Sequence, residues 1–443
     1  MAVGSTLKEN HLMANIVHFG KYYFPDAGGI ESVTKSLARG AVASGHTVSV
    51  VCFEKKTANS DEVIDGVRII RTPITKMTAS QPLGVKYFLQ CLKAAKNSDV
   101  VHLHVPNMLG ALCALFIGKR PRLLVHWHSD VINKGLLGKI LRPLESALLR
   151  CADCIVVTSQ VYADASETLR PYKDKIAVVP IGVADSKHAG VYSDLPTSID
   201  ALIYGKKIIL AVGRLVPYKG FKVLIDAAKH LSDDSVAVIV GGGPLQQELQ
   251  QGIELAGVKD RVVLAGRLSD AALHTLFERA MLYCLPSTNR AEAFGVVLLE
   301  AMTYGLPIVA TDIPGSGVPW VNQHGSSGLN VPVGDPVALA EACNQILASS
   351  ELRGRLSEGA RQRFVDDFTE EVCFVKATDK SWDDVGILRV VVVARAVEVR
   401  GHDAAVVHPM ALAVLAVVAF AELDASNLGD GVGLVGGFQR ACQ

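Results

Sequence analysis

Short runs of apolar, often β-branched residues alternate along the chain with longer segments whose apolar positions recur every three to four residues. The short runs predict buried strands, and the longer segments predict amphipathic helices. Such alternation is typical of βαβ units and parallel sheets. In the first half the pattern predicts strands over 15–19, 47–52, 67–71, 99–104, 122–126, 154–159 and 176–180.

A second series of strands follows a polar stretch over 186–205 that contains Pro196 and reads as a linker. Helices are predicted between the strands of both series, for example over 30–44, 83–97 and 221–231. The chain is therefore expected to be an α/β protein with two Rossmann-like, doubly wound domains facing across a cleft. The second series comprises 207–212, 236–240, 261–265, 281–285 and 308–311.

These patterns place an N-terminal domain at 13–185 and a C-terminal domain at 206–366. Residues 1–12 form an N-terminal extension before Met13, which could be the natural start. From residue 388 the composition changes abruptly, since 24 of the last 56 residues are Val or Ala. This atypical tail, 388–443, is assigned no function; a membrane-seeking segment is the alternative.

Composition supports a soluble two-domain protein, with 443 residues, 49% hydrophobic and 20% charged. The longest apolar run, 410–422, is shorter than the roughly 20 residues that cross a bilayer. No secretory signal is recognised at the N-terminus. Cys151 and Cys154 form a C-x-x-C pattern, but two separate core cysteines are favoured over a redox pair. The expected location is the cytoplasm.

Charge is uneven although it balances overall. Residues 1–185 carry 22 Lys and Arg against 15 Asp and Glu, whereas residues 186–443 carry 22 against 29. The basic half is consistent with an anionic partner, and a chance distribution over two surfaces is the alternative.

The first candidate site follows the first strand, where Gly28 and Gly29 precede a helix. Bare backbone can approach a phosphate closely there, and the helix N-terminus supplies oriented N–H groups. A turn without ligand is the alternative interpretation.

The second candidate site follows the strand 207–212. Arg214 and Lys219 flank a tight turn before the next helix, and two cations at this spacing suit a diphosphate. Ordinary surface cations are the alternative. Gly242, within Gly241-Gly242-Gly243, is expected to keep the floor of the site free of side chains.

The third candidate site is a run from Glu292 to Glu300. Glu292 is expected in a loop and Glu300 inside a helix, roughly 12 Å apart at 1.5 Å per residue. This separation is too long for two carboxylates acting on one bond, and it suits the two ends of one ligand. Backbone amides over 295–297 are expected to meet the charge between them, and Phe294, Gly295 and Val296 are expected among the donor-binding residues.

Taken together, these motifs resemble the retaining GT-B glycosyltransferases of family four. The resemblance covers residues 15–385 and rests on the Gly-Gly loop, Gly213-Arg214 with Lys219-Gly220, Gly241–Pro244, and Glu292 with Glu300. The run from Glu300-Ala301-Met302 to Gly305-Leu306-Pro307 adds to it. It implies that 367–387 contains a helix crossing back to the first domain.

By this resemblance, Arg214 and Lys219 hold the donor diphosphate and Glu300 binds the ribose hydroxyls. Glu292 binds hydroxyls of the transferred sugar. The Gly28-Gly29 loop closes over the phosphate and acceptor side. His128 lies where the family has a histidine beside the donor sugar, although a packed or turn-forming role is equally compatible.

The resemblance implies direct displacement with retention, in which the acceptor hydroxyl attacks the face from which the nucleotide diphosphate leaves. Neither a cofactor nor a metal is expected, because cations and helix dipoles replace the metal. The pairs His102/His104 and His126/His128 suggest metal ligands, but alternate residues of a buried strand are expected to face opposite sides, so no metal site is predicted there.

The chain resembles bacterial mannosyltransferases of O-antigen and exopolysaccharide synthesis, as in 126–130 and 315–322. GDP-mannose is the expected donor, and a polyprenyl-diphosphate-linked glycan is the expected acceptor. The alternatives are a UDP-hexose donor, a nucleotide-sugar 2-epimerase and a non-catalytic nucleotide-sugar-binding protein. Leucines and cations over 134–150 suggest docking at the inner face of the membrane, with a core-packed helix as the alternative. No nucleic-acid partner is expected.

Overall fold

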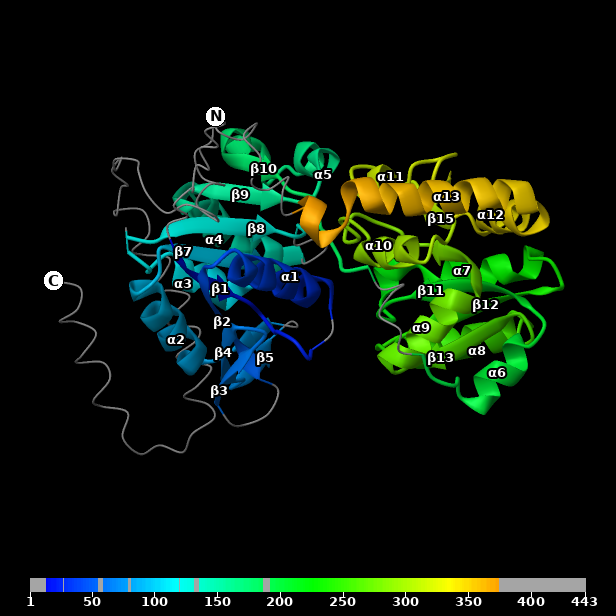
Figure 1. Cartoon of the computed structure of the whole chain (residues 1–443), viewed down its shortest axis with the longest axis horizontal. Coiled ribbons are helices and arrows are strands. Elements are labelled where there is room, and N and C mark those ends of the chain that lie inside the picture. The colour runs from blue at the N-terminus through cyan, green and yellow to red at the C-terminus, as the bar shows by residue number, and fades with distance from the viewer. Residues whose placement is uncertain are drawn as a thin grey trace, which may run out of the picture.

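The computed structural model describes residues 13–26, 28–54, 59–78, 81–118, 120–130, 135–185 and 192–373, with only the backbone for 135–140. The predicted extension 1–12, the tail 388–443 and most of the predicted crossover segment lie outside these residues. The chain forms two α/β domains arranged along the long axis of the molecule (Figure 1). In the described part of the chain, no helix is long and apolar enough to span a membrane.

The N-terminal domain contains an eight-stranded sheet with the order β10-β9-β8-β7-β1-β2-β4-β3. All neighbouring strands are parallel except β3 and β4, and a separate hairpin joins β5 and β6. The strands are β1 (Asn15–Phe19), β2 (Thr47–Glu54), β3 (Ser60–Ile64), β4 (Val67–Pro73), β5 (Lys76–Thr78), β6 (Gln81–Leu83), β7 (Val100–Val105), β8 (Arg122–Trp127), β9 (Cys154–Val157) and β10 (Ile176–Val178).

Helices cover both faces of this sheet because its strands are apolar on both sides, as parallel strands require. On one face, Ala38 and Ala41 of α1 pack near Ile16. The other face packs against α2, α3 and α4. The helices are α1 (Gly29–Ala43), α2 (Val85–Lys96), α3 (Met108–Ala114), α4 (Gly135–Cys151), α5 (Gln160–Ala165) and the 3-10 helix η1 (Arg170–Lys175).

The C-terminal domain has a six-stranded, fully parallel sheet with the order β13-β12-β11-β14-β15-β16. One apolar cluster joins it to α9, α10 and α13, and another joins it to α7, α8 and α12. The elements are β11 (Lys207–Val212), η3 (Pro217–Lys219), α7 (Phe221–Ala227), η4 (Ala228–His230), β12 (Ser235–Val240), α8 (Gln246–Leu255), β13 (Val262–Gly266), α9 (Asp270–Arg279), β14 (Ala280–Leu285), α10 (Val296–Thr303), β15 (Ile308–Thr311), α11 (Val318–Val321), β16 (Gly328–Val331), α12 (Pro336–Ala348) and α13 (Ser350–Asp367).

Every strand predicted from the sequence overlaps an observed strand, and 15–19, 207–212 and 308–311 match β1, β11 and β15 residue for residue. The predicted linker is only partly irregular. It contains the helix α6 (Thr197–Ile203), which buries Ile199 and Ile203 in the core of the C-terminal domain. Thr197 and Ser198 are exposed on the opposite side, so α6 is a short amphipathic helix.

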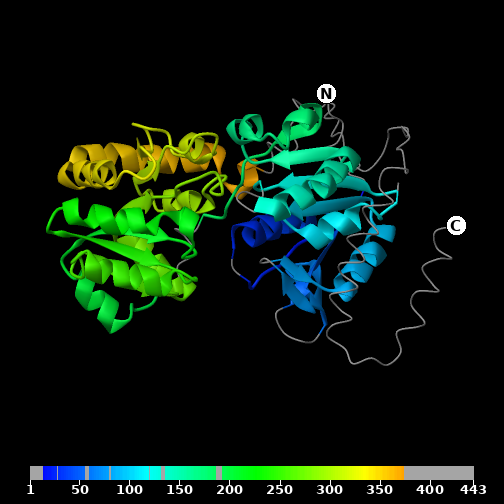
Figure 2. The same ribbon diagram turned by 180° about the vertical axis from the view of Figure 1, so that it is seen from behind.

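The chain passes between the domains twice, and the two crossing segments lie side by side (Figure 2). Val183 forms an isolated parallel bridge with Thr369, and its N–H donates to the carbonyl of Phe368 at 3.0 Å. Arg361 of α13 forms an ion pair with Asp185 at 2.5 Å. After α13, residues 370–373 form a helical turn next to the N-terminal domain, at the start of the predicted crossover segment.

Both sheets reverse their strand order beside their first strand. In the N-terminal sheet the reversal lies between β1 and β7, and in the C-terminal sheet between β11 and β14. Loops at the carboxyl ends of such strands diverge and leave room for a ligand. The Gly28-Gly29 loop follows β1, Lys219 follows β11, and Glu292 follows β14.

Candidate active site

The loop after β11 and the loop after β14 are held together by their backbones. Thr288 N–H donates to the carbonyl of Tyr218 at 2.8 Å, and its hydroxyl donates to the same oxygen at 3.3 Å. The sequence-predicted residues Lys219 and Glu292 are thereby brought into direct contact, although they are 73 positions apart along the chain.

Lys219 and Glu292 form a mostly buried ion pair. Lys219 Nζ lies 2.6 Å from Glu292 Oε2, and their side chains are 12% and 10% exposed. Burial lowers the pKa of Lys219, but attraction from Glu292 and Tyr218 outweighs it, so the net shift is upward and the ammonium stays charged. An ammonium has three N–H donors, so Lys219 can hold Glu292 and still offer donors to a phosphate.

Glu292 is fixed in place by hydrogen bonds to its side chain and its backbone. Ser287 Oγ donates to its carboxylate at 3.0 Å, while Ser316 Oγ donates to its carbonyl oxygen. Gly317 N–H donates to the carbonyl of the next residue, Ala293, at 2.7 Å. This carboxylate is therefore positioned before any ligand arrives, as a site that orients a sugar requires.

Arg214 is exposed and interacts electrostatically across the domain boundary with Glu31, in the first turn of α1. Burial raises the pKa of Glu31, and Arg214 and Lys21 oppose the rise. The Glu31 carboxylate folds back over Gly28 so closely that a side chain there would overlap it. No role was predicted for Glu31, although an acidic residue in a first helical turn is a signal that a sequence can show.

The Gly28-Gly29 loop also lies close to the start of α10. A Cβ added at Gly29 would come within 3.7 Å of Val296. Gly295 caps α10 with a left-handed φ of 78°, which turns the first amides of this helix toward the same region. The side chain of Phe294 packs with Trp320 and Phe368, so only the backbone of this residue can face a donor.

The three-glycine turn after β12 has a structural reason that the sequence did not reveal. A Cβ on Gly241 would overlap the carbonyl oxygen of Gly213, so the two loops pack backbone against backbone. A Cβ on Gly242 would come within 2.6 Å of Arg267 Nε. The turn therefore supports the loop that carries Arg214 and Lys219.

Gly220 fixes the position of Lys219, and Gly220→Ala is expected to destabilise the protein by about 3 kcal/mol and to abolish turnover. Its φ is +65°, and an added Cβ would overlap the carbonyl oxygen of Pro286. Gly257 is the matched control, because its φ is +68° with nothing within 4 Å. Gly257→Ala should cost about 1 kcal/mol. Denaturant unfolding measures both, and equal losses would contradict the close-packing argument.

Glu300 lies in the middle of α10, half-buried and without a strong ion-pair partner among the described residues. Burial raises its pKa to about 7; Lys219 lowers it and Asp270 raises it further. The carboxylate therefore forms as pH rises through neutrality and is lost below it. In this environment, the Glu300 carboxyl group titrates within the pH range in which enzymes work.

Donor affinity is expected to fall with pH in step with Glu300 protonation. With a pKa of about 7, the ionised fraction drops about tenfold between roughly pH 8 and pH 6, and kcat/KM for the nucleotide sugar should follow. Glu300→Gln cannot titrate and should flatten this part of the profile. An unchanged slope in Glu300→Gln would show that another group controls it.

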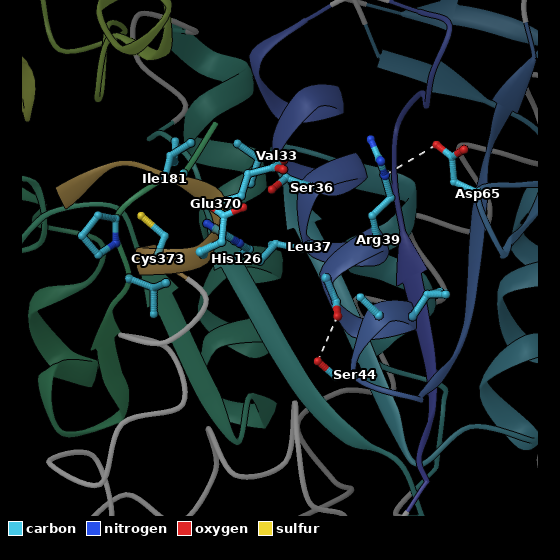
Figure 3. Close-up of a pocket in the computed structure, with 17 residues that line it drawn as sticks. Val33, Ser36, Leu37, Arg39, Ser44, Asp65, His126, Ile181, Glu370 and Cys373 are labelled. Carbon is cyan, nitrogen blue, oxygen red and sulfur yellow. Dashed lines mark hydrogen bonds and ion pairs between the residues drawn. The ribbon is translucent and has the colours of Figure 1, made fainter. Parts of the chain in front are cut away.

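A cavity of about 500 Å³ lies beside α1, away from these residues (Figure 3). It is lined by Val33, Ile181, Glu370, Cys373 and His126, among others, and by none of the sequence-predicted site residues. The charged loops after β11 and β14 are therefore the better candidate for a donor site, because they combine cations, a fixed carboxylate and a helix N-terminus.

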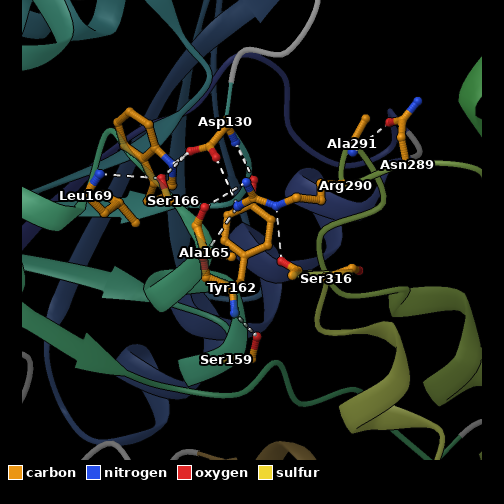
Figure 4. A network of polar contacts seen from close by, with 12 residues as sticks. Asp130, Ser159, Tyr162, Ala165, Ser166, Leu169, Asn289, Arg290, Ala291 and Ser316 are labelled. Carbon is orange, nitrogen blue, oxygen red and sulfur yellow. Dashed lines mark hydrogen bonds and ion pairs between the residues drawn. The ribbon is translucent and has the colours of Figure 1, made fainter. Parts of the chain in front are cut away.

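Arg290 connects the Glu292 loop to the N-terminal domain (Figure 4). Its guanidinium lies 3.1 Å from the carboxylate of Asp130, donates to the carbonyl of Ala165 at 3.0 Å, and stacks 4.8 Å from the ring of Tyr162. Asp130 in turn accepts from Trp127 Nε1 at 2.9 Å. Neither Arg290 nor Asp130 stands out in the sequence, because only the folded chain brings them together.

His128 follows β8 and lies two residues before Asp130. The ion pair between Asp130 and Arg290 therefore links the loop of His128 to the loop of Glu292. Its Nε2 is 3.0 Å from His104 Nδ1. Burial lowers the pKa of His128 to about 3, so the ring is neutral at physiological pH. It can exchange hydrogen bonds with a sugar hydroxyl but cannot supply a positive charge.

The prediction that alternate histidines face opposite sides of their strands was wrong. His102 and His104 stack with ring centroids 4.5 Å apart, and His126 and His128 stack at 4.1 Å. Side chains in a strand repeat every two residues, so positions i and i+2 share a face. Two three-histidine groups result, each with ligand atoms within 4.8 Å of one another.

The predicted membrane-docking surface on α4 is also wrong in part. Leu141, Leu144 and Leu148 are 6%, 7% and 1% exposed, and Leu144 and Leu148 belong to the core under the sheet. The helix is amphipathic, and these three leucines form its buried stripe rather than a lipid-facing one. Arg142 and Arg150 are exposed; Leu136 and Leu137 have side chains outside the described part.

Comparisons with known proteins agree with this geometry. Residues 28–182 match the glycosyl transferase 4-like domain, and residues 200–363 match glycosyl transferases group 1. The chain is 32% identical over 357 residues to O-antigen chain mannosyltransferase C of Escherichia coli, covering 80% of this chain and 95% of the relative.

A D-rhamnosyltransferase of Pseudomonas aeruginosa is 31% identical over 356 residues, covering 80% of this chain and 92% of that protein. Among solved structures, the sucrose-phosphate synthase of Thermosynechococcus elongatus superposes with a TM-score of 0.67 at 22% identity. That superposition covers 81% of this chain and 96% of that one. It shows a shared GT-B fold of two Rossmann-like domains.

Proposed function

The chain belongs to the glycosyl transferases group 1 family and is a glycosyltransferase, and from this premise we propose that it transfers mannose from GDP-mannose to a lipid-linked oligosaccharide. The observation that carries the proposal is the Lys219–Glu292 pair, at 2.6 Å, beside the strand-order reversal of the C-terminal sheet. It joins a cation suited to a diphosphate with a fixed carboxylate suited to sugar hydroxyls.

The donor diphosphate would lie between Arg214, Lys219 and the N-terminus of α10, as a GT-B donor site requires. Negative charge grows on the leaving diphosphate as the glycosidic bond breaks, and cations already in place stabilise that charge without reorganising. These groups would do the work that a divalent cation does elsewhere, so diphosphate release is proposed to need no metal.

The sugar would lie between Glu292 and the N-terminal domain, with its hydroxyls donating hydrogen bonds to the Glu292 carboxylate. His128, a neutral ring whose Nε2 faces His104, would offer its Nδ1 to a sugar hydroxyl from the opposite domain. Glu300 would bind the ribose hydroxyls when ionised. The acceptor hydroxyl would attack from the face that the diphosphate leaves, passing its proton to a donor phosphate oxygen, so that the anomeric configuration is retained.

The choice of mannose and of polysaccharide synthesis is supported by the relatives. The Escherichia coli relative is an O-antigen chain mannosyltransferase. The basic N-terminal half and the exposed Arg142 and Arg150 of α4 are compatible with an acceptor that carries a lipid diphosphate at the inner face of an anionic membrane. We propose that the chain contacts the membrane by electrostatic attraction. The three leucines of the buried stripe of α4 do not insert into the lipid.

A donor panel tests the proposal. The chain is incubated with GDP-mannose, UDP-glucose or UDP-N-acetylglucosamine together with a lipid-linked oligosaccharide, and the product anomer is read by NMR. An α-linked mannosyl product from GDP-mannose alone is expected. A product formed only from a UDP-sugar would overturn the proposed donor, and inverted configuration would overturn the proposed displacement. Donor epimerisation without acceptor would identify a 2-epimerase instead.

A further inference from the structure

Five buried histidines gather on one face of the N-terminal sheet. His18 in β1 is level with His102 in β7, and His104 in β7 is level with His126 in β8. His128 directly follows β8. Toward the amino ends of these strands the same face carries apolar residues such as Ile16 and Val100. This buried face of the sheet is therefore apolar toward the amino ends of the strands and lined with histidine rings toward their carboxyl ends.

The rings are in contact, yet their hydrogen bonds are incomplete. His104 joins two partners: its Nε2 lies 3.0 Å from His18 Nδ1, and its Nδ1 lies 3.0 Å from His128 Nε2. Both ring nitrogens of His126, and Nε2 of His102, are buried without a hydrogen-bond partner among the described residues. Buried polar atoms without partners are uncommon and call for an unseen water or ion.

A neutral imidazole has one nitrogen lone pair, and this form of histidine binds transition metals. Because both ring nitrogens of His126 are buried without a hydrogen-bond partner among the described residues, its lone pair is available to an ion.

We propose that His104, His126 and His128 form a binding site for a divalent transition-metal ion of the zinc class. Their candidate ligand atoms all lie within 4.8 Å of one another. Two nitrogens bound to one tetrahedral Zn²⁺ are about 3.3 Å apart, close to the 3.0 Å between His104 Nδ1 and His128 Nε2. Within the described part of the chain, His126 has no side-chain hydrogen bond that it would lose when its ring tilts toward the ion.

The hydrogen bonds around His104 favour this set. When His104 Nδ1 binds the ion, its proton resides on Nε2, which then donates to His18 Nδ1 at the observed 3.0 Å. Metal-bound histidines usually donate their second ring N–H to such a partner, which orients the ring. His18 is thus an orienting residue, and the fourth coordination position is left for water or another ligand.

An ion can reach the site through the cavity beside α1. His126 lines this cavity of about 500 Å³ together with Glu370 and Glu371 (Figure 3). The negative charge of these two carboxylates would attract a cation into the cavity, whereas the three histidine ligands themselves are uncharged. An all-imidazole site selects zinc, copper, nickel or cobalt over magnesium, which prefers oxygen. The ion is therefore distinct in kind from a cation that would bind a donor diphosphate.

Zinc binding is the test. The full chain is purified without a polyhistidine tag, stripped with a chelator, and titrated with Zn²⁺ against a chromophoric competitor. We expect one Zn²⁺ per chain, and Co²⁺ should give the intense visible absorption of a tetrahedral site. His126→Asn should weaken binding at least about tenfold. His102→Asn is the matched control, because His102 is equally buried and stacked but is not a proposed ligand.

Thermal unfolding with and without Zn²⁺ separates ligand loss from misfolding. A bound ion stabilises the folded chain, so Zn²⁺ should raise the Tm of the wild type and of His102→Asn, but not that of His126→Asn. Absence of tight Zn²⁺ binding by the wild-type chain would overturn the proposal. Undiminished affinity in a folded His126→Asn chain, or an equal loss in His102→Asn, would also contradict the assigned ligands.

Discussion

Lys219→Met is expected to lower kcat/KM for sugar transfer about 1000-fold. Loss of a single donor aimed at developing negative charge typically costs about 10²–10³ in rate, and Lys219 is charged and 12% exposed. Methionine fills a similar volume without the ammonium, so the leaving diphosphate loses a partner and Glu292 is left buried without its counter-ion. The rate of nucleotide diphosphate release, measured at several donor concentrations, gives kcat and KM separately.

Lys222→Met is the matched control for this prediction, because Lys222 lies three residues further along the chain in α7 and its side chain is exposed. Its activity should stay close to that of the wild type. A Lys219→Met chain that unfolds at the wild-type temperature and keeps a rate within about tenfold of the wild type would contradict the role given to Lys219.

Glu292→Gln is expected to reduce kcat about 100- to 1000-fold, with a smaller change in KM. Glutamine can still accept the hydrogen bond from Ser287, observed at 3.0 Å, so the loop should keep its shape. The charge that orients Lys219 and accepts the sugar hydroxyls is lost. Single-turnover kinetics with a saturating nucleotide sugar measures the effect on the chemical step.

Two further chains sharpen the interpretation of Glu292→Gln. Glu248→Gln changes an exposed carboxylate on α8 and should leave the rate unaltered. The double variant Lys219→Met/Glu292→Gln should lose much less than the product of the two single losses, because the residues act as one pair at 2.6 Å. Fully multiplicative losses would mean that the two side chains act independently.

The sheets could be predicted because their strands are buried on both faces and read as continuous apolar runs between turn residues. β11 and β12 are such strands. The strands that were missed lack this signal. β3 is largely exposed and antiparallel at the sheet edge, and the four-residue β16 begins with glycine. Short edge strands carry too few buried positions to stand out in a sequence.

The motifs of the candidate site could be recognised in the sequence because they combine charge with glycine at the ends of strands. Their contacts were not predictable, since Lys219 and Glu292 meet only through strand order, which places β11 beside β14. Arg290 and Asp130 are 160 residues apart and pair across two domains. The histidine cluster was missed for a different reason. Residues two positions apart in a strand were expected on opposite faces of the sheet, whereas they share one face.

The most direct test of sugar transfer at the Lys219–Glu292 site is mass-spectrometric detection of GDP released from GDP-mannose, with and without a lipid-linked oligosaccharide, by the wild-type chain and by Glu292→Ala. Acceptor-dependent release by the wild type, lost in a folded Glu292→Ala chain, is the predicted result. Equal release by both chains would contradict the assigned site. Nucleotide-sugar binding without turnover of GDP-mannose or any UDP-hexose would contradict the proposed transfer itself.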